Sequence, residues 1–173
     1  MNHDSYPDAY ISGILARYRT IAMVGASATP SRPSYFAMKY LKEKGFRVIP
    51  VNPGQAGKTI LGENVCASLD GIAEPVDIVD IFRSSDAALE VTREAIKLGA
   101  KVVWMQLGVR NDAAARLAED AGLLVVMNRC PKIEYGRLSG ELGWAGVTSR
   151  RVSAKRPLLG PKGVQHRVLG RQD

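Results

Sequence analysis

Short runs of apolar residues alternate along this chain with longer segments in which apolar residues recur at helical spacing. Uninterrupted apolar runs of this length are typical of strands that are buried on both faces of a sheet. The runs, which predict strands, are residues 20–24, 46–49, 76–82, 101–105 and 123–127. The helical periodicity predicts helices over residues 6–19, 35–44, 85–98 and 111–121. Between the second and third runs, the turn-rich residues 54–75 predict only a short strand at 59–61 and a helical turn at 68–72.

This regular alternation of strand and helix predicts the fold class. Strands joined by single helices form right-handed crossovers, which give a parallel sheet with helices on both faces. We therefore expect an α/β, three-layer, doubly wound domain with a mostly parallel, Rossmann-like sheet. The length of 173 residues suits one such domain. We expect it to occupy residues 1–149, and residues 150–173 to form a basic, flexible C-terminal tail.

The net charge of +7 is concentrated near the end of the chain. The basic residues after position 145 are Arg150, Arg151, Lys155, Arg156, Lys162, Arg167 and Arg171, against the single acid Asp173. The rest of the chain is close to neutral. A basic tail can bind nucleic acid or simply extend into solvent. Because aromatic residues are not interleaved in it, we favour the solvated extension and keep nucleic-acid binding as the alternative.

The remaining composition indicates a cytoplasmic protein. Two cysteines, Cys66 and Cys130, are too few for a disulfide framework. The first residues, 1–4, lack a basic segment followed by an apolar one, so we expect no secretory signal. No apolar run approaches the roughly 20 residues that span a bilayer, so we expect no membrane association. A homodimer is plausible only as the commonest assembly of proteins in general.

The turn after the first strand carries the most informative chemistry. In doubly wound sheets, ligands bind outside the carboxyl ends of the strands. Here Gly25 allows a close approach of backbone to ligand, and a helix that begins near Pro33 directs its free N–H groups toward the same turn. Ser31 can cap that helix, and Arg32 supplies a guanidinium suited to phosphate. The turn therefore predicts an anion site, most naturally for a diphosphate.

Two common nucleotide motifs do not fit. The dinucleotide fingerprint needs three glycines and an acid at the end of the second strand. Residues 25–30 contain one glycine, and the second strand ends at Asn52. Gly57-Lys58-Thr59 resembles the end of a Walker motif, but its first glycine is replaced by Asn52. An NAD(P)-dependent oxidoreductase-like protein is thus an alternative that these motifs do not support.

Several ordered blocks of the sequence resemble a known family, the small stand-alone CoA-binding domain proteins. These are relatives of the N-terminal CoA-binding domain of the succinyl-CoA synthetase alpha subunit. The matching blocks are residues 21–27, 32–35, 50–53, 60–62, 76–83, 103–108 and 128–130. The resemblance runs from about residue 8 to residue 156, and it implies a Rossmann-like domain that binds coenzyme A or an acyl-CoA.

The resemblance also implies positions for the parts of CoA. Those expected around the diphosphate are Gly25, Ala26, Ser27, Arg32, Pro33, Ser34 and Tyr35. Asn52 and Pro53 would border the adenosine, with Lys58 as a candidate for its phosphate. Phe82 and Arg83 would flank the nucleotide or the start of the pantetheine arm. The residues expected along the arm toward the thiol are Gln106, Gly108, Asn128 and Cys130.

No convincing catalytic constellation accompanies these residues. The predicted strand ends lack histidines and ionised carboxylates, and Tyr135 stands where the family more often has histidine. His3 and His166 fall in the chain ends, which we expect to be flexible, without the spacing of metal ligands. We therefore expect no metal and no catalytic residue, and a non-catalytic carrier or regulatory module rather than an enzyme.

A few side chains allow more than one interpretation. Cys130 can pack beside the pantetheine or, as a thiolate favoured by the adjacent Arg129, form a mixed disulfide with CoA. Packing is the interpretation that we favour. Asp80 is expected to hydrogen-bond nearby backbone, and Trp104 and Phe36 are expected to fill the core.

Overall fold

A computed structural model describes residues 1–140 of the chain. Its α-helices are α1 (Asp8–Arg17), α2 (Pro33–Glu43), α3 (Ala88–Leu98), α4 (Asp112–Asp120) and α5 (Pro131–Leu138). Its strands are β1 (Thr20–Val24), β2 (Arg47–Val51), β3 (Thr59–Ile60), β4 (Glu63–Asn64), β5 (Ile78–Ile81), β6 (Val102–Met105) and β7 (Leu124–Val126). Two short 3₁₀ helices, η1 (Pro53–Gln55) and η2 (Leu69–Gly71), lie in the turn-rich stretch.

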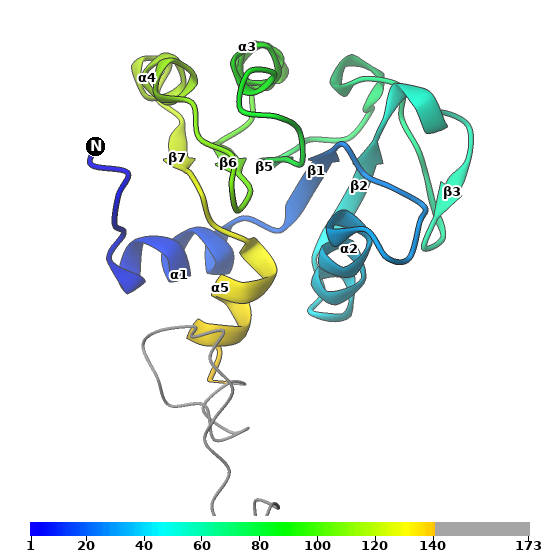
Figure 1. Cartoon of the computed structure of the whole chain (residues 1–173), viewed down its shortest axis with the longest axis horizontal. Coiled ribbons are helices and arrows are strands. Elements are labelled where there is room, and N and C mark those ends of the chain that lie inside the picture. The colour runs from blue at the N-terminus through cyan, green and yellow to red at the C-terminus, as the bar shows by residue number, and fades with distance from the viewer. Residues whose placement is uncertain (141–173) are drawn as a thin grey trace, which may run out of the picture.

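A five-stranded sheet in the order β2-β1-β5-β6-β7 forms the middle of the molecule (Figure 1). Every neighbouring pair in it is parallel. The chain runs from β1 to one edge at β2, then returns to the other side of β1 as β5, so the strand order reverses between β1 and β5. The predicted doubly wound α/β class is confirmed, and the reversal fixes the expected ligand crevice at β1 and β5.

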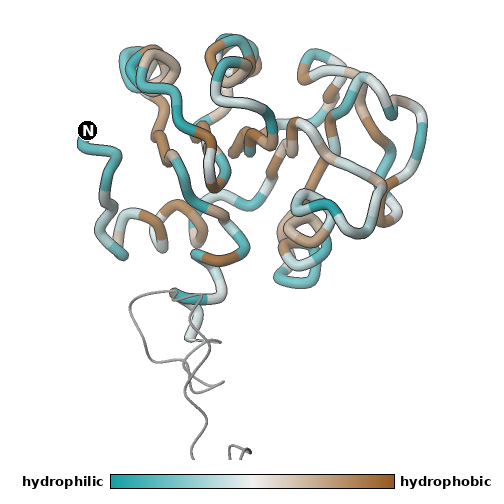
Figure 2. Tube along the Cα trace, viewed as in Figure 1, coloured by the Kyte–Doolittle hydropathy of each residue, from teal (hydrophilic) through white to brown (hydrophobic). Residues whose placement is uncertain are grey.

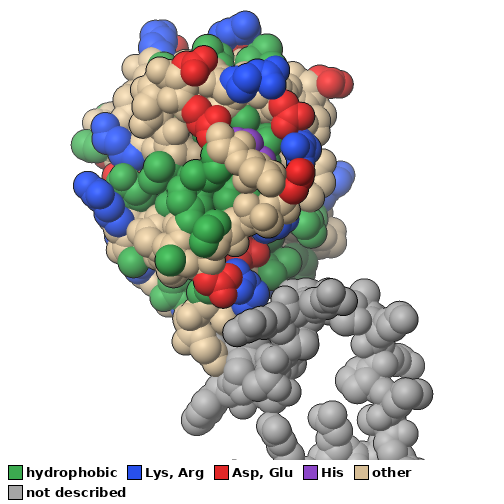
Figure 3. Space-filling model, turned by 90° about the vertical axis from the view of Figure 1, so that its left-hand side faces the viewer, with side chains coloured by type: hydrophobic (Ala, Val, Ile, Leu, Met, Phe, Trp, Pro, Cys, Tyr) green, Lys and Arg blue, Asp and Glu red, His purple; other side chains and the backbone are tan. Residues whose placement is uncertain are grey.

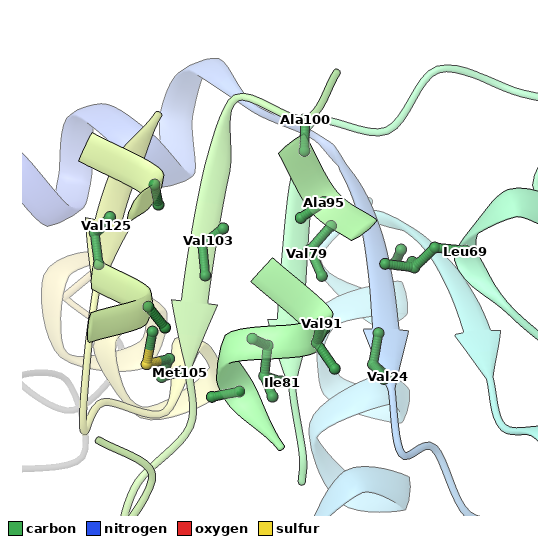
Figure 4. Packing of buried hydrophobic residues seen from close by; sticks show 14 of the residues in the cluster. Val24, Leu69, Val79, Ile81, Val91, Ala95, Ala100, Val103, Met105 and Val125 are labelled. Carbon is green, nitrogen blue, oxygen red and sulfur yellow. The ribbon is translucent and has the colours of Figure 1, made fainter. Parts of the chain in front are cut away.

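Helices cover both faces of the sheet, which makes three layers. On one face, β-strand side chains pack against α3 and α4; Figure 4 shows Val79, Ile81 and Val103 beside Val91 and Ala95 of α3. The opposite face packs against α1, α2 and α5. Figure 2 shows the hydrophobic positions along the strands and on the inner sides of the helices. The strands are apolar without alternation because both faces are buried.

Two tyrosines cover the outer edge of the sheet at β7. The Tyr10 hydroxyl donates to the Val125 carbonyl at 3.1 Å and accepts from its N–H at 3.2 Å. The Tyr6 hydroxyl accepts from the Met127 N–H at 2.7 Å. These bonds satisfy backbone groups that an edge strand otherwise offers to another chain. Figure 3 views this side of the molecule and shows hydrophobic side chains gathered among charged ones of both signs.

Some expectations for individual residues are wrong. Phe36 is 52% exposed, because α2 turns its neighbours Ala37 and Met38 toward the sheet instead; Trp104, in contrast, is fully buried as expected. His3 is not part of a loose end: it is 8% exposed, and its Nδ1 lies 2.8 Å from the Tyr6 hydroxyl.

Besides the short η1, two elements were not expected. The pattern of the sequence does not predict α5, which begins with Pro131 in its first turn. It also does not predict β4, which pairs with β3 in an antiparallel ribbon. Within residues 1–140, no helix has the length and apolar character needed to cross a membrane. The expected basic tail lies outside the described residues, so its proposed roles stay predictions.

Candidate functional site

Gly25 forms a turn that only glycine can make. Its φ is +90°, and a Cβ built on it would lie 2.4 Å from the carbonyl oxygen of Phe82. Its N–H donates to Val51 at 2.9 Å, so the turn bridges the ends of β2 and β5. A side chain here would meet backbone rather than a movable group. The sequence therefore places glycine where the backbone has to pass between the two neighbouring strand ends.

The loop that follows is held by side chains from the end of β2. The Asn52 Nδ2 donates to the Ala26 carbonyl at 2.7 Å, and its Oδ1 accepts from the Gly54 N–H at 2.9 Å. The Gln55 Oε1 accepts from the Ala28 N–H at 3.0 Å. These bonds fix the loop without any ligand, which lowers the entropy that binding has to overcome.

The first turn of α2 faces this loop. Arg32 is the N-cap residue and Pro33 occupies the first helical position, with no side-chain hydrogen bond at the cap. Ser31 therefore does not cap the helix, and that expectation is wrong. Pro33 has no N–H, and the Tyr35 N–H already donates to the Arg32 carbonyl at 3.0 Å. The helix start therefore keeps the Ser34 N–H and the positive end of the helix dipole for another acceptor.

Two arginines stand beside the Gly25 turn. Arg32 and Arg83 are both exposed, and within residues 1–140 neither guanidinium has an acidic partner within 4 Å. The Arg83 side chain lies close over Gly25, since a Cβ built there would be 3.2 Å from the Arg83 Cδ. Together with the helix start, these cations make the turn electropositive and suited to phosphate oxygens.

A cavity of about 620 Å³ opens at this point, outside the carboxyl ends of the strands. A volume of this size is typical of small-molecule sites. The predicted residues that line it are Gly25, Ser27, Arg32, Pro33, Ser34, Asn52, Phe82, Arg83, Gln106 and Cys130. Its lining also includes Gln55, Leu107, Val109 and Ile133, which sequence reasoning missed. The structure thus joins the Gly25 turn to Cys130 through one continuous cavity.

The other predicted residues do not line this cavity. They are Ala26, Tyr35, Pro53, Lys58, Gly108 and Asn128. Asn128 has a positive φ of 53°, and its Oδ1 accepts from the Gly108 N–H at 2.8 Å. That bond joins the turns after β6 and β7. Ala26 is 1% exposed and packs in the core. Lys58 precedes β3 and does not line the cavity.

A buried carboxyl lies behind the cavity. Asp80 in β5 is fully buried, and Gln106, which lines the cavity, donates from Nε2 to its oxygens at 3.1 and 3.2 Å. Its partner is thus a side chain rather than the backbone that we expected. Burial raises the pKa of Asp80 to about 8, although the bond from Gln106 opposes the shift. The carboxyl is consequently mainly neutral at pH 7.

Cys130 is poorly suited to nucleophilic chemistry. Burial is the main cause that raises the pKa of its thiol, and the charge of Asp80 acts in the same direction. Backbone N–H groups of α5 oppose the shift only in part. We expected Arg129 to lower the pKa of this thiol, but burial instead dominates and raises it. A thiol with a raised pKa is a weak nucleophile at neutral pH, which favours the packing interpretation.

The all-parallel sheet, the reversal of strand order and the cationic cavity at that reversal define a doubly wound, Rossmann-like domain. Within that class, the chain belongs to the CoA binding domain family, whose model matches residues 19–136. It is similar to the uncharacterised protein YneT of Bacillus subtilis. The two are 36% identical over 127 residues, which cover 73% of this chain and 93% of YneT.

Solved structures share the fold. A hypothetical protein from Pyrococcus horikoshii OT3 is 41% identical, with a TM-score of 0.75 over 81% of this chain and 97% of that one. A Thermus thermophilus protein is 39% identical, with a TM-score of 0.74 over 77% of this chain and 99% of that one. The dinucleotide-forming acetyl-coenzyme A synthetase 1 of Ca. Korarchaeum cryptofilum is 25% identical, with a TM-score of 0.56. There the match covers 63% of this chain but only 25% of the synthetase chain.

Proposed function

We propose that this protein binds coenzyme A, free or acylated, in the cavity between the Gly25 turn and Cys130. The observation that carries the proposal is the pair of exposed arginines, Arg32 and Arg83, beside a glycine turn and an uncapped helix start. Membership of the CoA binding domain family supports CoA over other phosphate-bearing ligands. The diphosphate would lie at the turn and at the start of α2.

The rest of the ligand would follow the cavity wall. The adenosine would lie beside Asn52 and Pro53, and Lys58 would reach its phosphate from the turn before β3. The pantetheine arm would pass Phe82 and Gln106 toward Cys130, all of which line the cavity. Gly108 and Asn128 would support the end of the cavity at Cys130 through their mutual hydrogen bond rather than by direct contact with the ligand. The arm has amide groups that pair with neutral polar side chains such as that of Gln106.

A carrier or regulatory role in the cytoplasm, without a reaction, fits these residues best. The buried carboxyl of Asp80 is held behind the cavity by Gln106, and the Cys130 thiol is kept protonated by burial. Neither group is prepared to accept a proton or attack a carbonyl at neutral pH. What the protein then supplies is a rigid, cationic cavity that holds a CoA molecule.

Isothermal titration calorimetry of the whole chain with CoA tests this function. We expect a dissociation constant near or below about 1 μM, in the range of specific cofactor binding. NADH and NADPH should bind at least about a hundredfold more weakly, because the glycine fingerprint and the ribose acid are missing. Preferential binding of NADH would favour the oxidoreductase-like alternative. A protein that takes up no CoA at millimolar concentration would refute the proposal.

A further inference from the structure

A second cavity, of about 480 Å³, lies against the first. The two share Leu107, Cys130 and Ile133 as lining residues, so the two cavities adjoin at the wall that these residues form. The remaining walls come from the segment before α1, from α1 itself, from the turn after β7 and from α5. The second cavity therefore begins where the proposed path of the pantetheine arm ends.

Of the residues that the structure describes, two arginines line this second cavity, and only one of them has its charge neutralised by nearby carboxylates. Arg137 donates to the Glu134 carboxylate at 2.7 Å and to the Asp8 carboxylate at 2.8 Å, so its charge is neutralised. Arg129 instead donates to the backbone carbonyls of Asn128, at 2.8 Å, and of Asp4, at 3.4 Å. In the described part of the chain, the one carboxylate within 4 Å of Arg129 is that of Glu134, at 3.9 Å.

Arg129 is also well held. Its guanidinium carbon lies 5.6 Å from the centre of the Tyr6 ring, and the Tyr6 hydroxyl is fixed by the Met127 N–H. A guanidinium has five N–H donors, and the two backbone carbonyls use only part of them. Arg129 is thus a fixed cation with N–H donors to spare, and the nearest carboxylate among the described residues, that of Glu134, is already paired with Arg137. Such a cation is suited to bind an anionic group that enters the cavity.

We propose that the second cavity receives the acyl group of an acyl-CoA whose acyl chain ends in a carboxylate, and that Arg129 binds this carboxylate. The inference rests on the proposed CoA function, because it places the thioester at the wall of Leu107, Cys130 and Ile133. Because the two cavities adjoin there, an acyl chain that continues past these residues enters the second cavity. No bond is made or broken; Arg129 is a specificity-determining residue.

A purely alkyl acyl chain suits this cavity less well. It would remove water from Arg129 and from the Arg137–Glu134 pair without giving either a new partner, which is unfavourable. A terminal carboxylate replaces the lost water at Arg129 with a charge-assisted hydrogen bond. The charge of Glu134 is a smaller obstacle, since Arg137 already donates to this carboxylate from both Nε and Nη2.

Matched pairs of thioesters test the inference. Malonyl-CoA with propionyl-CoA, and glutaryl-CoA with valeryl-CoA, differ within each pair mainly by a terminal carboxylate in place of a methyl group. Calorimetry of the whole chain should show that the carboxylated member of at least one pair binds roughly tenfold more tightly, as one charge-assisted hydrogen bond provides. Arg129→Gln should abolish this preference and leave the affinity for free CoA unchanged. Arg129→Lys, which keeps the charge, should retain part of it.

The outcomes separate the two proposals. If CoA binds but both pairs show equal affinities, or if the alkyl members bind more tightly, the inference is wrong while CoA binding stands. A preference that persists in Arg129→Gln also overturns it. If neither CoA nor any thioester binds, the CoA function itself fails. Should Arg129→Gln not fold, the pairwise comparison on the unaltered chain together with Arg129→Lys still decides.

Discussion

The Gln106 amide donates to both carboxylate oxygens of Asp80, at 3.1 and 3.2 Å, in a position where Asp80 has no exposed surface. This pair connects the buried centre of the sheet with the cavity, because Gln106 also lines the cavity. The contact orients an amide that the ligand would meet. It also keeps a carboxyl with a pKa of about 8 inside the core.

Asp80 should make stability depend on pH. Its pKa is 3.8 when unperturbed and about 8 in the fold, so between these values the native state holds a proton that the unfolded chain has released. The free energy of unfolding should then fall as pH rises from about 4 to 8, by up to about 1.4 kcal/mol for each pH unit, and level off above. Urea unfolding at several pH values measures this slope. In Asp80→Asn the slope should be clearly reduced; equal slopes in both proteins would contradict the assignment.

Gly25→Ala should destabilise the fold and not only the site. The new Cβ would lie 2.4 Å from the Phe82 carbonyl oxygen, at a φ of +90° that alanine rarely adopts. We expect a loss of roughly 2–4 kcal/mol in the free energy of unfolding. Gly13→Ala in α1 is the matched control, because nothing lies within 4 Å of its added Cβ. The control should gain about 0.5–1 kcal/mol from helix propensity. A Gly25→Ala protein as stable as the original would show that Gly25 does not lie as close to the Phe82 carbonyl as described.

The arginines beside the turn should contribute to affinity for CoA and little to stability. Arg32→Ala and Arg83→Ala should each weaken CoA binding by about tenfold or more in calorimetry, since each removes a charge-assisted contact with phosphate. Arg93→Ala, which removes an exposed arginine paired with Glu90 on α3, should leave the affinity unchanged. A similar small effect in all three variants would place the diphosphate elsewhere.

Cys130 should react slowly with thiol reagents and be protected by CoA. Its raised pKa leaves little thiolate at neutral pH, and reaction requires the thiolate. In a Cys66→Ser protein, where Cys130 is the remaining cysteine, labelling by a disulfide reagent should be slower than for an unfolded control and should accelerate as the pH rises. Adding acetyl-CoA, whose sulfur is acylated and therefore does not consume the reagent, should slow it further. Fast labelling at pH 7, or labelling that acetyl-CoA does not affect, would argue against a buried thiol beside the pantetheine.

The strands and the anion-binding turn could be predicted from the sequence because their signals are local. Buried strands occur in the sequence as runs of apolar residues, and Gly25 marks the end of the first such run. Parallel topology then collects the residues after each strand at one edge, which is why Arg32, Gln106 and Cys130 line one cavity although they are far apart in the sequence.

Features that depend on tertiary contacts escaped prediction. The Asp80–Gln106 pair joins two strands whose register no local pattern specifies. His3 and the segment around it are ordered by Tyr6, whose hydroxyl binds the backbone of Met127. Helix α5 is short, and its Pro131 could equally have marked a turn. Gln55 and Val109 lack the charge or spacing of a motif, and only the folded chain brings them to the cavity.

A crystal structure of the protein with CoA is the most direct test of this mode of binding. We expect the diphosphate within hydrogen-bonding distance of the Ser34 N–H at the start of α2 and of the Arg32 guanidinium. The CoA sulfur should lie at the wall formed by Leu107, Cys130 and Ile133. A CoA molecule whose diphosphate lies away from the Gly25 turn, or whose sulfur points away from Cys130, would contradict it.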